Sequence, residues 1–387
     1  MRGFAGVSGS RLQRSGLARA ISPDVRFGPA MMLWLAAGAC GIVSMGATAR
    51  AGLRLERQAD RLVIETDAGE PVAEYVFADP RIGRPSLRDL RTPAGCVVTR
   101  PCPPRPGIDP PDHPTMHPGA MLCFSDLSGH DPWRHKTAVR FVGFAEEPTT
   151  RDGGVTLTAV SEYLAAADDT PDAAVICREE SAISIGDRDV AGARVRLIRW
   201  VAVLTAGPAG VTFGDVQEMG FGIRLAKELA PKWGGRYLAS HGGRDEEQVF
   251  GRQAAWCDAS GTVDCRPCGV LCVDGEGNPR QPFFHARDSG WLLMNHFGCQ
   301  TYTGGDSGAV MVEPGATLRL SAVFVLHDGL PEDALAELAA GVGLAAAAPG
   351  GPGAAASATR PGRLVPPTVI EAHVAAFNRL DPEDVVG

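Results

Sequence analysis

The chain has 387 residues, of which 44% are hydrophobic and 21% charged, so it is long enough to bury one large core or two ordinary ones. Its formal net charge is −8, and the sequence shows no basic stripe. Surfaces that bind nucleic acid or anionic membranes require clustered positive charge, so both classes of partner are excluded from the expected functions.

Residues 1–49 have the pattern of an export signal. Five arginines precede the uncharged run Ala30–Ala49, which ends in the small-residue sequence Ala47-Thr48-Ala49. The run is also about as long as the ~20 residues that a membrane helix needs, so an uncleaved N-terminal anchor is the alternative. We therefore expect a secreted or periplasmic protein, or one anchored to the membrane only by its N-terminus.

Nine cysteines follow the expected signal, and in an oxidising compartment thiols pair by default. The segment Cys257–Cys272 contains a CxxC with flanking cysteines, and local disulfides are favoured there over a zinc site because a second, separate pair is missing. Cys96 and Cys102 are predicted to close a small disulfide loop.

Alternating apolar and polar residues predict strands through most of the chain, beginning with "LRLERQADRLVIETDAGEPVAEYVF" (53–77) and ending with "LRLSAVFVLHDG" (318–329). Many short strands separated by Gly, Pro and Asp turns are typical of an all-β, antiparallel β-sandwich, and the supersandwich of sugar mutarotases would suit this pattern. We assign residues 50–340 to this domain, with one short helix at 331–342. An Ala/Gly/Pro-rich linker (341–363) and a C-terminal tail (364–387) follow.

The segment Asp112–Lys136, "DHPTMHPGAMLCFSDLSGHDPWRHK", holds four of the nine histidines in the chain. The prolines at 110, 111, 114 and 118 keep its first part out of a helix and stiffen it as a loop. A stiff loop that presents imidazoles and carboxylates beside a strand is a common way to build the rim of a pocket. The alternative is that these side chains only satisfy turn backbone, as Asx turns do.

Four segments together resemble the bacterial PmoA-like family, a domain of unknown function: the histidine segment, "GDVQEMGFGIRL" (214–225), "FGRQAAWCDASG" (250–261) and "GVLCVDGEGNPRQPFFHARDSGWLLMNHFG" (269–298). The resemblance covers roughly residues 55–330 in the same order and implies a secreted protein from bacteria that degrade complex carbohydrate. Many relatives have adjacent histidines after Asp-His-Pro, where this chain reads Thr115-Met116-His117. Methane oxidation is not supported, because a membrane subunit of that kind crosses the bilayer several times.

These segments supply the candidate site. We predict four catalytic residues, His113, His117, Glu218 and His285, and six residues that bind substrate, Asp112, Asp126, His130, Trp133, Arg287 and Asp288. Imidazole beside carboxylate either moves protons at a sugar carbon or holds a divalent metal, so the cofactor stays open. The leading hypothesis is a lyase, hydrolase or epimerase that acts on a carbohydrate or another small molecule. The alternatives are a sugar-binding module without activity and a metal-dependent oxidoreductase.

Overall fold

The computed structural model describes residues 52–344, so the predicted export signal, the tail and most of the predicted linker lie outside the described residues. Strands make up 49% of the structure and helices 9%, which confirms the all-β prediction. The strands are β1 (Leu53–Arg57), β2 (Arg61–Thr66), β3 (Pro71–Val76), β4 (Ser86–Arg88), β5 (Ala120–Phe124), β6 (Val139–Arg151), β7 (Gly154–Leu164), β8 (Val175–Val190), β9 (Ala193–Ala206), β10 (Val211–Phe213), β11 (Met219–Arg224), β12 (Arg236–Ala239), β13 (Arg252–Gln253), β14 (Trp256–Val263), β15 (Arg266–Asp274), β16 (Phe283–Arg287), β17 (Trp291–Asn295), β18 (Val310–Val312) and β19 (Thr317–His327).

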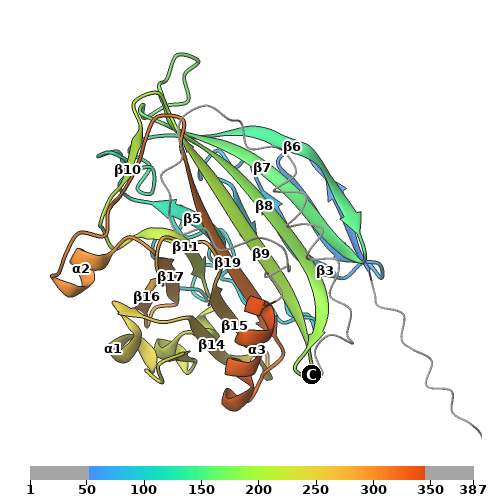
Figure 1. Cartoon of the computed structure of the whole chain (residues 1–387). Coiled ribbons are helices and arrows are strands. Elements are labelled where there is room, and N and C mark those ends of the chain that lie inside the picture. Colours follow the sequence, from blue (N-terminus) through green and yellow to red (C-terminus); the bar gives the residue numbers. More distant parts are fainter. Residues whose placement is uncertain (1–51, 345–387) are drawn as a thin grey trace, which may run out of the picture. The chain divides into compact units, whose positions relative to one another are not determined.

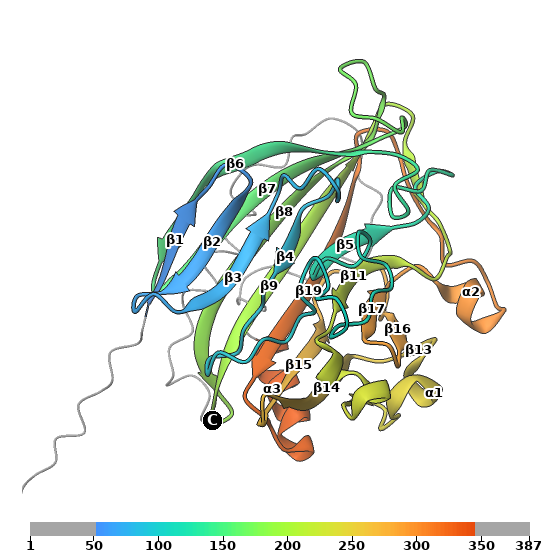
Figure 2. The ribbon, with the colours of Figure 1, turned by 180° about the vertical axis from the view of Figure 1, so that it is seen from behind.

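Two large antiparallel sheets form a sandwich, as the sequence pattern predicts (Figures 1 and 2). One sheet has the strand order β1-β2-β3-β4-β5-β11-β17-β16-β13, and the other has the order β12-β14-β15-β19-β9-β8-β7-β6. A small third sheet pairs β10 with β18. Strands distant in sequence, such as β5, β11 and β17, thereby become neighbours in the nine-stranded sheet.

The core lies between the two large sheets, where alternate residues of each strand point inward. Aromatic rings from opposite sheets meet there: Phe124 of β5 lies 5.5 Å from Tyr163 of β7, and Phe221 of β11 lies 5.7 Å from Trp200 of β9, measured between ring centroids. Outward-facing residues of β5 (Met121 and Cys123) and β17 (Trp291 and Leu293) form a separate cluster with Trp133. The nine-stranded sheet is therefore packed on both faces at this point.

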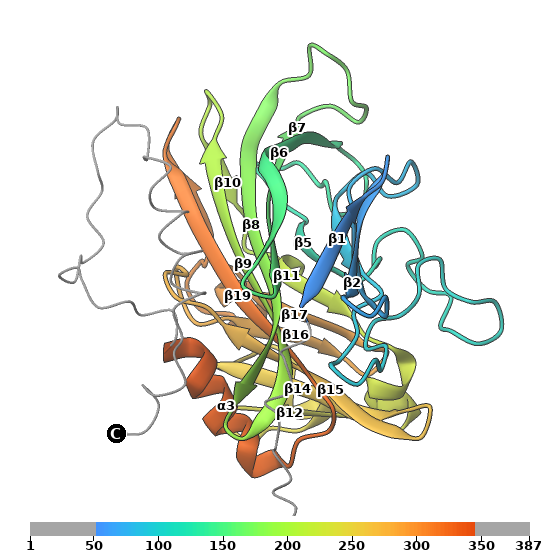
Figure 3. The same cartoon turned by 90° about the vertical axis from the view of Figure 1, so that its right-hand side faces the viewer.

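Helices are short and peripheral (Figure 3). They are η1 (Lys227–Leu229), η2 (Pro231–Trp233), α1 (Asp245–Val249), α2 (Cys299–Thr303) and α3 (Glu332–Leu344). The last of these, α3, confirms the helix predicted at 331–342, and it packs through Leu335 and Leu338 on the outer side of the eight-stranded sheet. Within residues 52–344, none of the helices combines the length and apolar character needed to cross a membrane.

The cysteines do not follow the disulfide prediction: all nine in the described residues are free thiols. Cys96 packs in the core, whereas the Cys102 thiol contacts the Pro114 carbonyl oxygen, so the predicted small loop is not closed. Cys257 and Cys272 face each other across β14 and β15, and burial raises the pKa of both thiols. These cysteines act as small apolar core residues.

A carboxyl group lies inside the core, at Glu179 of β8. It accepts hydrogen bonds from the Tyr163 hydroxyl, at 2.6 Å, and from the Ser181 hydroxyl, which in turn accepts one from the Trp200 indole. Burial nevertheless raises the pKa of Glu179 above its ordinary value, because desolvation outweighs the two hydrogen bonds. Ionised Glu179 therefore costs the folded state free energy.

The substitution Glu179→Gln tests this cost. A group whose pKa is raised in the folded state stabilises the fold most below its unfolded pKa, and this stability is lost as the pH rises toward the folded pKa. We expect Glu179→Gln to lose less stability than the unsubstituted protein as the pH rises above about 4.3, the ordinary pKa of a glutamate, as measured by urea denaturation. The control is Glu180→Gln, at a partly exposed neighbour. Parallel pH profiles for all three proteins would contradict the assignment.

Candidate functional site

The candidate site lies on the outer face of the nine-stranded sheet, over β5, β11, β17 and β16. Directly opposed residues of an antiparallel pair share a face. One row across the sheet is Arg224, Trp291 and Arg287, and the next is Met121, Gly222, Leu293 and His285. The register thus places two of the predicted residues, His285 and Arg287, on the face that the histidine segment covers.

Glycines in β11 make room for a tryptophan on this face. A Cβ added at Gly222 would lie 2.2 Å from the Trp291 ring, so only glycine lets the indole lie against the strand. The His117 ring stacks on Trp291 with ring centroids 4.1 Å apart and an interplanar angle of 8°, and it lies 5.3 Å from Trp133. His117, Trp133 and Trp291 form one buried unit, which we call the aromatic stack.

Buried guanidinium groups hold the histidine segment over the aromatic stack. Arg100 donates to four carbonyl oxygens of this segment, those of Pro110, Asp112, His113 and His117. Arg224 of β11 donates to the Asp112 carboxylate at 2.8 Å and faces the Nδ1 atom of His117 at 3.4 Å. The prolines only restrict the backbone of the loop, whereas these contacts fix its conformation.

Asp112 and His113 form a dyad at the surface of the site. The His113 Nδ1 atom lies 3.2 Å from the Asp112 carboxylate, and the His113 side chain is 53% exposed. Burial raises the pKa of Asp112, but Arg224 and the His113 hydrogen bond outweigh it and hold that pKa below its ordinary value. His113 also has φ of 48°, a left-handed conformation that non-glycine residues rarely adopt. An ionised carboxylate thus orients a strained, accessible imidazole.

His117 is buried and His113 is exposed, although the two rings stack with their centroids 4.8 Å apart. Burial, together with the Arg224 guanidinium, lowers the pKa of His117 well below its ordinary value. The imidazole is therefore neutral near pH 7, and because Arg224 donates toward Nδ1, its proton lies on Nε2. The Nε2 atom is buried without a hydrogen-bond partner among the described residues.

His285 lies in a chain of hydrogen bonds between Arg287 and α2. Arg287 donates from Nε to the His285 Nε2 atom at 3.2 Å, and His285 Nδ1 donates to the Tyr302 hydroxyl at 3.1 Å. Tyr302 donates onward to the Gln217 carbonyl oxygen. Burial, with Arg287 next, lowers the pKa of His285 to about 3, so this imidazole stays neutral and orients its neighbours rather than exchanging protons near pH 7.

Glu218 lies at the start of β11, where the histidine segment returns to the sheet. Its carboxylate forms an ion pair with Arg134, which also pairs with Asp131, and its side chain is 17% exposed. Arg134 directly follows Trp133 of the aromatic stack. Glu218 therefore lies beside the aromatic stack, on the covered outer face. In sequence it is far from the Asp112–His113 dyad.

Three predicted residues have structural roles in turns of the described chain, away from the aromatic stack. Asp126 accepts a hydrogen bond from the Gly129 amide, as in an Asx-type turn. The backbone of His130 pairs with that of Leu127 in the same tight turn. Asp288 lies in the turn between β16 and β17, where its carboxylate accepts from the Glu246 amide of α1. Sequence reasoning placed these residues with the others because they share the same segments.

Four residues that build the site were not among the predicted ones: Arg100, Arg224, Trp291 and Tyr302. One signal was available in the sequence, since Gly220, Gly222 and Arg224 recur at every second position of β11 and thus share a face. Two glycines at this spacing indicate a bulky group packed against the strand. The partner, Trp291, could not be identified without the strand order.

A divalent metal fits this site poorly. Asp112, His113 and His117 have one potential ligand atom each within 4.8 Å of one another, the closest such group in residues 52–344. However, Asp112 is already paired with Arg224 and Arg100, and both guanidinium groups would repel a cation. The two imidazoles also stack face to face, whereas a metal 2.0–2.1 Å from each nitrogen would need to lie in both ring planes.

The first prediction concerns the aromatic stack. We expect Gly222→Ala to displace Trp291 and to destabilise the protein by about 1–3 kcal/mol, the usual cost of overpacking. Urea denaturation measures the loss, and near-ultraviolet circular dichroism reports the tryptophan environment. The matched control is Gly83→Ala, where an added Cβ meets nothing within 4 Å. Equal effects of the two substitutions would show that Trp291 does not press on β11.

The second prediction concerns metal. Because two arginines hold Asp112, we expect the dialysed protein to contain less than about one zinc, iron or copper ion per two chains by elemental analysis. The substitution Arg224→Gln removes one repelling charge and should raise zinc occupancy if the three ligands can rearrange. Stoichiometric metal in the unsubstituted protein, lost in His113→Ala, would overturn this expectation.

Comparison with protein families gives one match. Residues 63–340 match a family described as "Family of unknown function (DUF6807)", and that description names neither an activity nor PmoA. None of the curated proteins compared with the chain matches it. Since the match covers more than half of the chain and includes every residue of the aromatic stack, the chain belongs to the family of unknown function DUF6807.

Proposed function

We propose that the protein binds a carbohydrate at this outer-face site and catalyses proton transfer on it, as a lyase, hydrolase or epimerase. The observation that carries the proposal is the Asp112–His113 dyad: an accessible imidazole whose Nδ1 atom faces a carboxylate that Arg224 holds ionised. A base oriented by a third group is the arrangement that general acid–base catalysis uses. His113 is the acid or base, and Asp112 positions it.

A binding module without activity is the weaker alternative. Such modules present exposed aromatic side chains to sugar rings, but Trp133 and Trp291 are 0% and 2% exposed. The aromatic stack therefore supports the dyad from below and offers no platform to a ligand. This burial favours an enzyme over a module.

The substrate class rests on the ion pairs that flank the aromatic stack and His285. Paired carboxylates and guanidinium groups, such as Glu218 with Arg134 and Glu246 with Arg287, accept from and donate to adjacent hydroxyl groups. The resemblance of the sequence to the PmoA-like family supports the same class, and with it a secreted or periplasmic location. A metal-dependent oxidoreductase has only the clustered ligand atoms of Asp112, His113 and His117 in its favour.

The test compares His113 variants on a panel of oligosaccharides that includes uronate-containing chains. Mass spectrometry detects cleavage, ultraviolet absorbance detects an unsaturated lyase product, and proton exchange into solvent deuterium detects epimerisation. We expect His113→Ala to lower kcat by about 100- to 10,000-fold, the usual contribution of a general acid or base. His113→Gln should be equally impaired, because an amide does not exchange protons near pH 7.

The control is His241→Ala, at an exposed histidine whose ring only accepts a hydrogen bond from the Gly243 amide in its own turn. It should retain the activity of the unsubstituted protein. Consumption of a glycan at an unchanged rate by His113→Ala would refute the role of the dyad. Saturable glycan binding without any turnover would show that the protein is a binding module and not an enzyme.

A further inference from the structure

A second cleft, of about 500 Å³, lies beside the loop that carries Trp133, away from the Asp112–His113 dyad. Its walls come from the segment after β3, from residues 132–138 and from the start of β6. Ligand pockets of proteins usually have volumes of about 300–1,000 Å³. The cleft is therefore large enough for a small organic molecule.

One wall of the cleft is apolar. Phe77 and Phe141 stack with ring centroids 4.8 Å apart, and Ile82 and Val139 extend the same surface. Binding sites for small molecules combine such a surface with a few polar groups that fix orientation. The ligand of this cleft should thus have an apolar or aromatic body.

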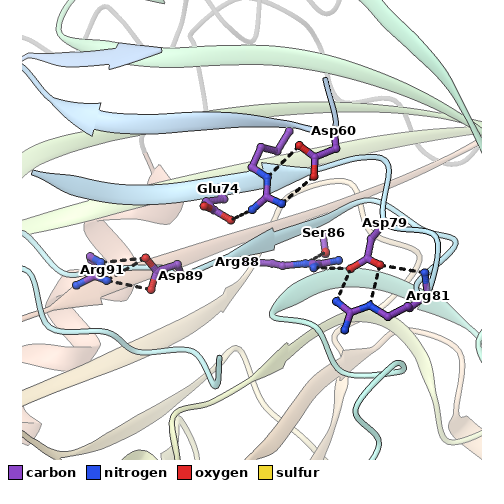
Figure 4. Close-up of polar contacts among 9 residues, drawn as sticks. Asp60, Glu74, Asp79, Arg81, Ser86, Arg88, Asp89 and Arg91 are labelled. Atoms are coloured by element: carbon purple, nitrogen blue, oxygen red, sulfur yellow. Dashed lines mark hydrogen bonds and ion pairs between the residues drawn. The ribbon is translucent and has the colours of Figure 1, made fainter. Parts of the chain in front are cut away.

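Most charged groups of the cleft already have partners. Asp79 accepts hydrogen bonds from Arg88 and Arg81, as Figure 4 shows. Arg140 pairs with Glu162 and Asp169. These charges are neutralised by partners within the protein, so none of them requires a charged ligand.

Arg84 is the exception. It lines the cleft with 6% of its surface exposed, and no carboxylate of residues 52–344 lies within ion-pair distance of it. Its terminal nitrogens donate to the carbonyl oxygens of Pro132, Met116 and Trp133, its guanidinium lies 4.4 Å above the Trp133 ring, and its Nε atom has no hydrogen-bond partner. A buried cation without a counter-charge is costly to the folded state. Burial accordingly lowers the pKa of Arg84 to about 10.

A second buried donor lines the same cleft. The Thr137 side chain is 8% exposed, and its hydroxyl oxygen has no hydrogen-bond partner among the described residues. Arg84 and Thr137 thus both line the cleft, the first with a charge and the second with a hydroxyl. Of the simple acceptor groups, a carboxylate matches both, because it carries the missing negative charge and accepts several hydrogen bonds.

We propose that the cleft lined by Phe77, Phe141, Arg84 and Thr137 is a second binding site, for a small carboxylate with an apolar or aromatic body. The apolar body lies against Phe77 and Phe141, and the carboxylate lies at the Arg84 end. This site is separate from the Asp112–His113 dyad, so it stands whether or not the protein acts on carbohydrate.

The test uses two fluorescent probes of the same shape, 2-naphthoate and the neutral 2-naphthalenemethanol, titrated into the full chain. We expect 2-naphthoate to bind saturably and at least about tenfold more tightly than the alcohol, because only the acid pairs with Arg84. Arg84→Gln should remove this preference. Ala138→Leu, which narrows the cleft and leaves Arg84 in place, should weaken binding of both probes.

The controls separate loss of the site from loss of the fold. Arg84 also holds three loop carbonyls, so the melting temperature of Arg84→Gln is measured first. If that variant does not fold, Ala138→Leu and the comparison of the two probes decide the question. Equal affinity for the acid and the alcohol, unchanged binding in Ala138→Leu, or no saturable binding of 2-naphthoate would each overturn the proposal.

Discussion

The contact between Trp291 and the bare backbone of β11 determines the rest of the site. Because Gly222 has no side chain, the indole lies flat across the sheet and offers its free face to His117. His117 then carries His113 above it, at a centroid distance of 4.8 Å. Each ring is positioned by the one beneath it, so the accessible imidazole of His113 is connected to the sheet through two packed rings, those of His117 and Trp291.

A loop, and not a helix, covers this face because the buried arginines need acceptors. Arg100 is 2% exposed and donates to four backbone carbonyl oxygens of the histidine segment. The carbonyls of a helix are already bonded within the helix and could not serve. Prolines at 110, 111, 114 and 118 keep the segment irregular, and irregular backbone leaves its carbonyls free. On the opposite sheet, the apolar helix α3 packs on the strands, and Arg199 of β9 donates to the Val342 carbonyl oxygen in the last turn of that helix, where helix carbonyls are free.

Local pattern in the sequence predicts the architecture well and the site only in part. Strand alternation identifies the sandwich because each strand must face one core, and that requirement is local. The Asp112–His113–His117 group is likewise local, so its members could be found together. Trp291 and Arg224 join it only through the strand order β5-β11-β17, which pairs residues 67 to 103 positions apart and leaves little trace in one sequence. The disulfide prediction failed for the same reason: Cys96 is close to Cys102 in sequence, but the fold takes its thiol into the core.

The charge of the site also differs from what its residue types imply. Histidines beside an aspartate favour a cation when the sequence is considered alone. In the fold, Arg100 and Arg224 lie where a metal bound to Asp112 would lie. They pair with its carboxylate and hold it in place. Burial, with Arg287 facing the ring, similarly lowers the pKa of His285 and keeps it neutral. Burial, with the neighbouring guanidinium groups, thus keeps the rings of His117 and His285 neutral, whereas the His113 ring is 53% exposed and lies beside the Asp112 carboxylate.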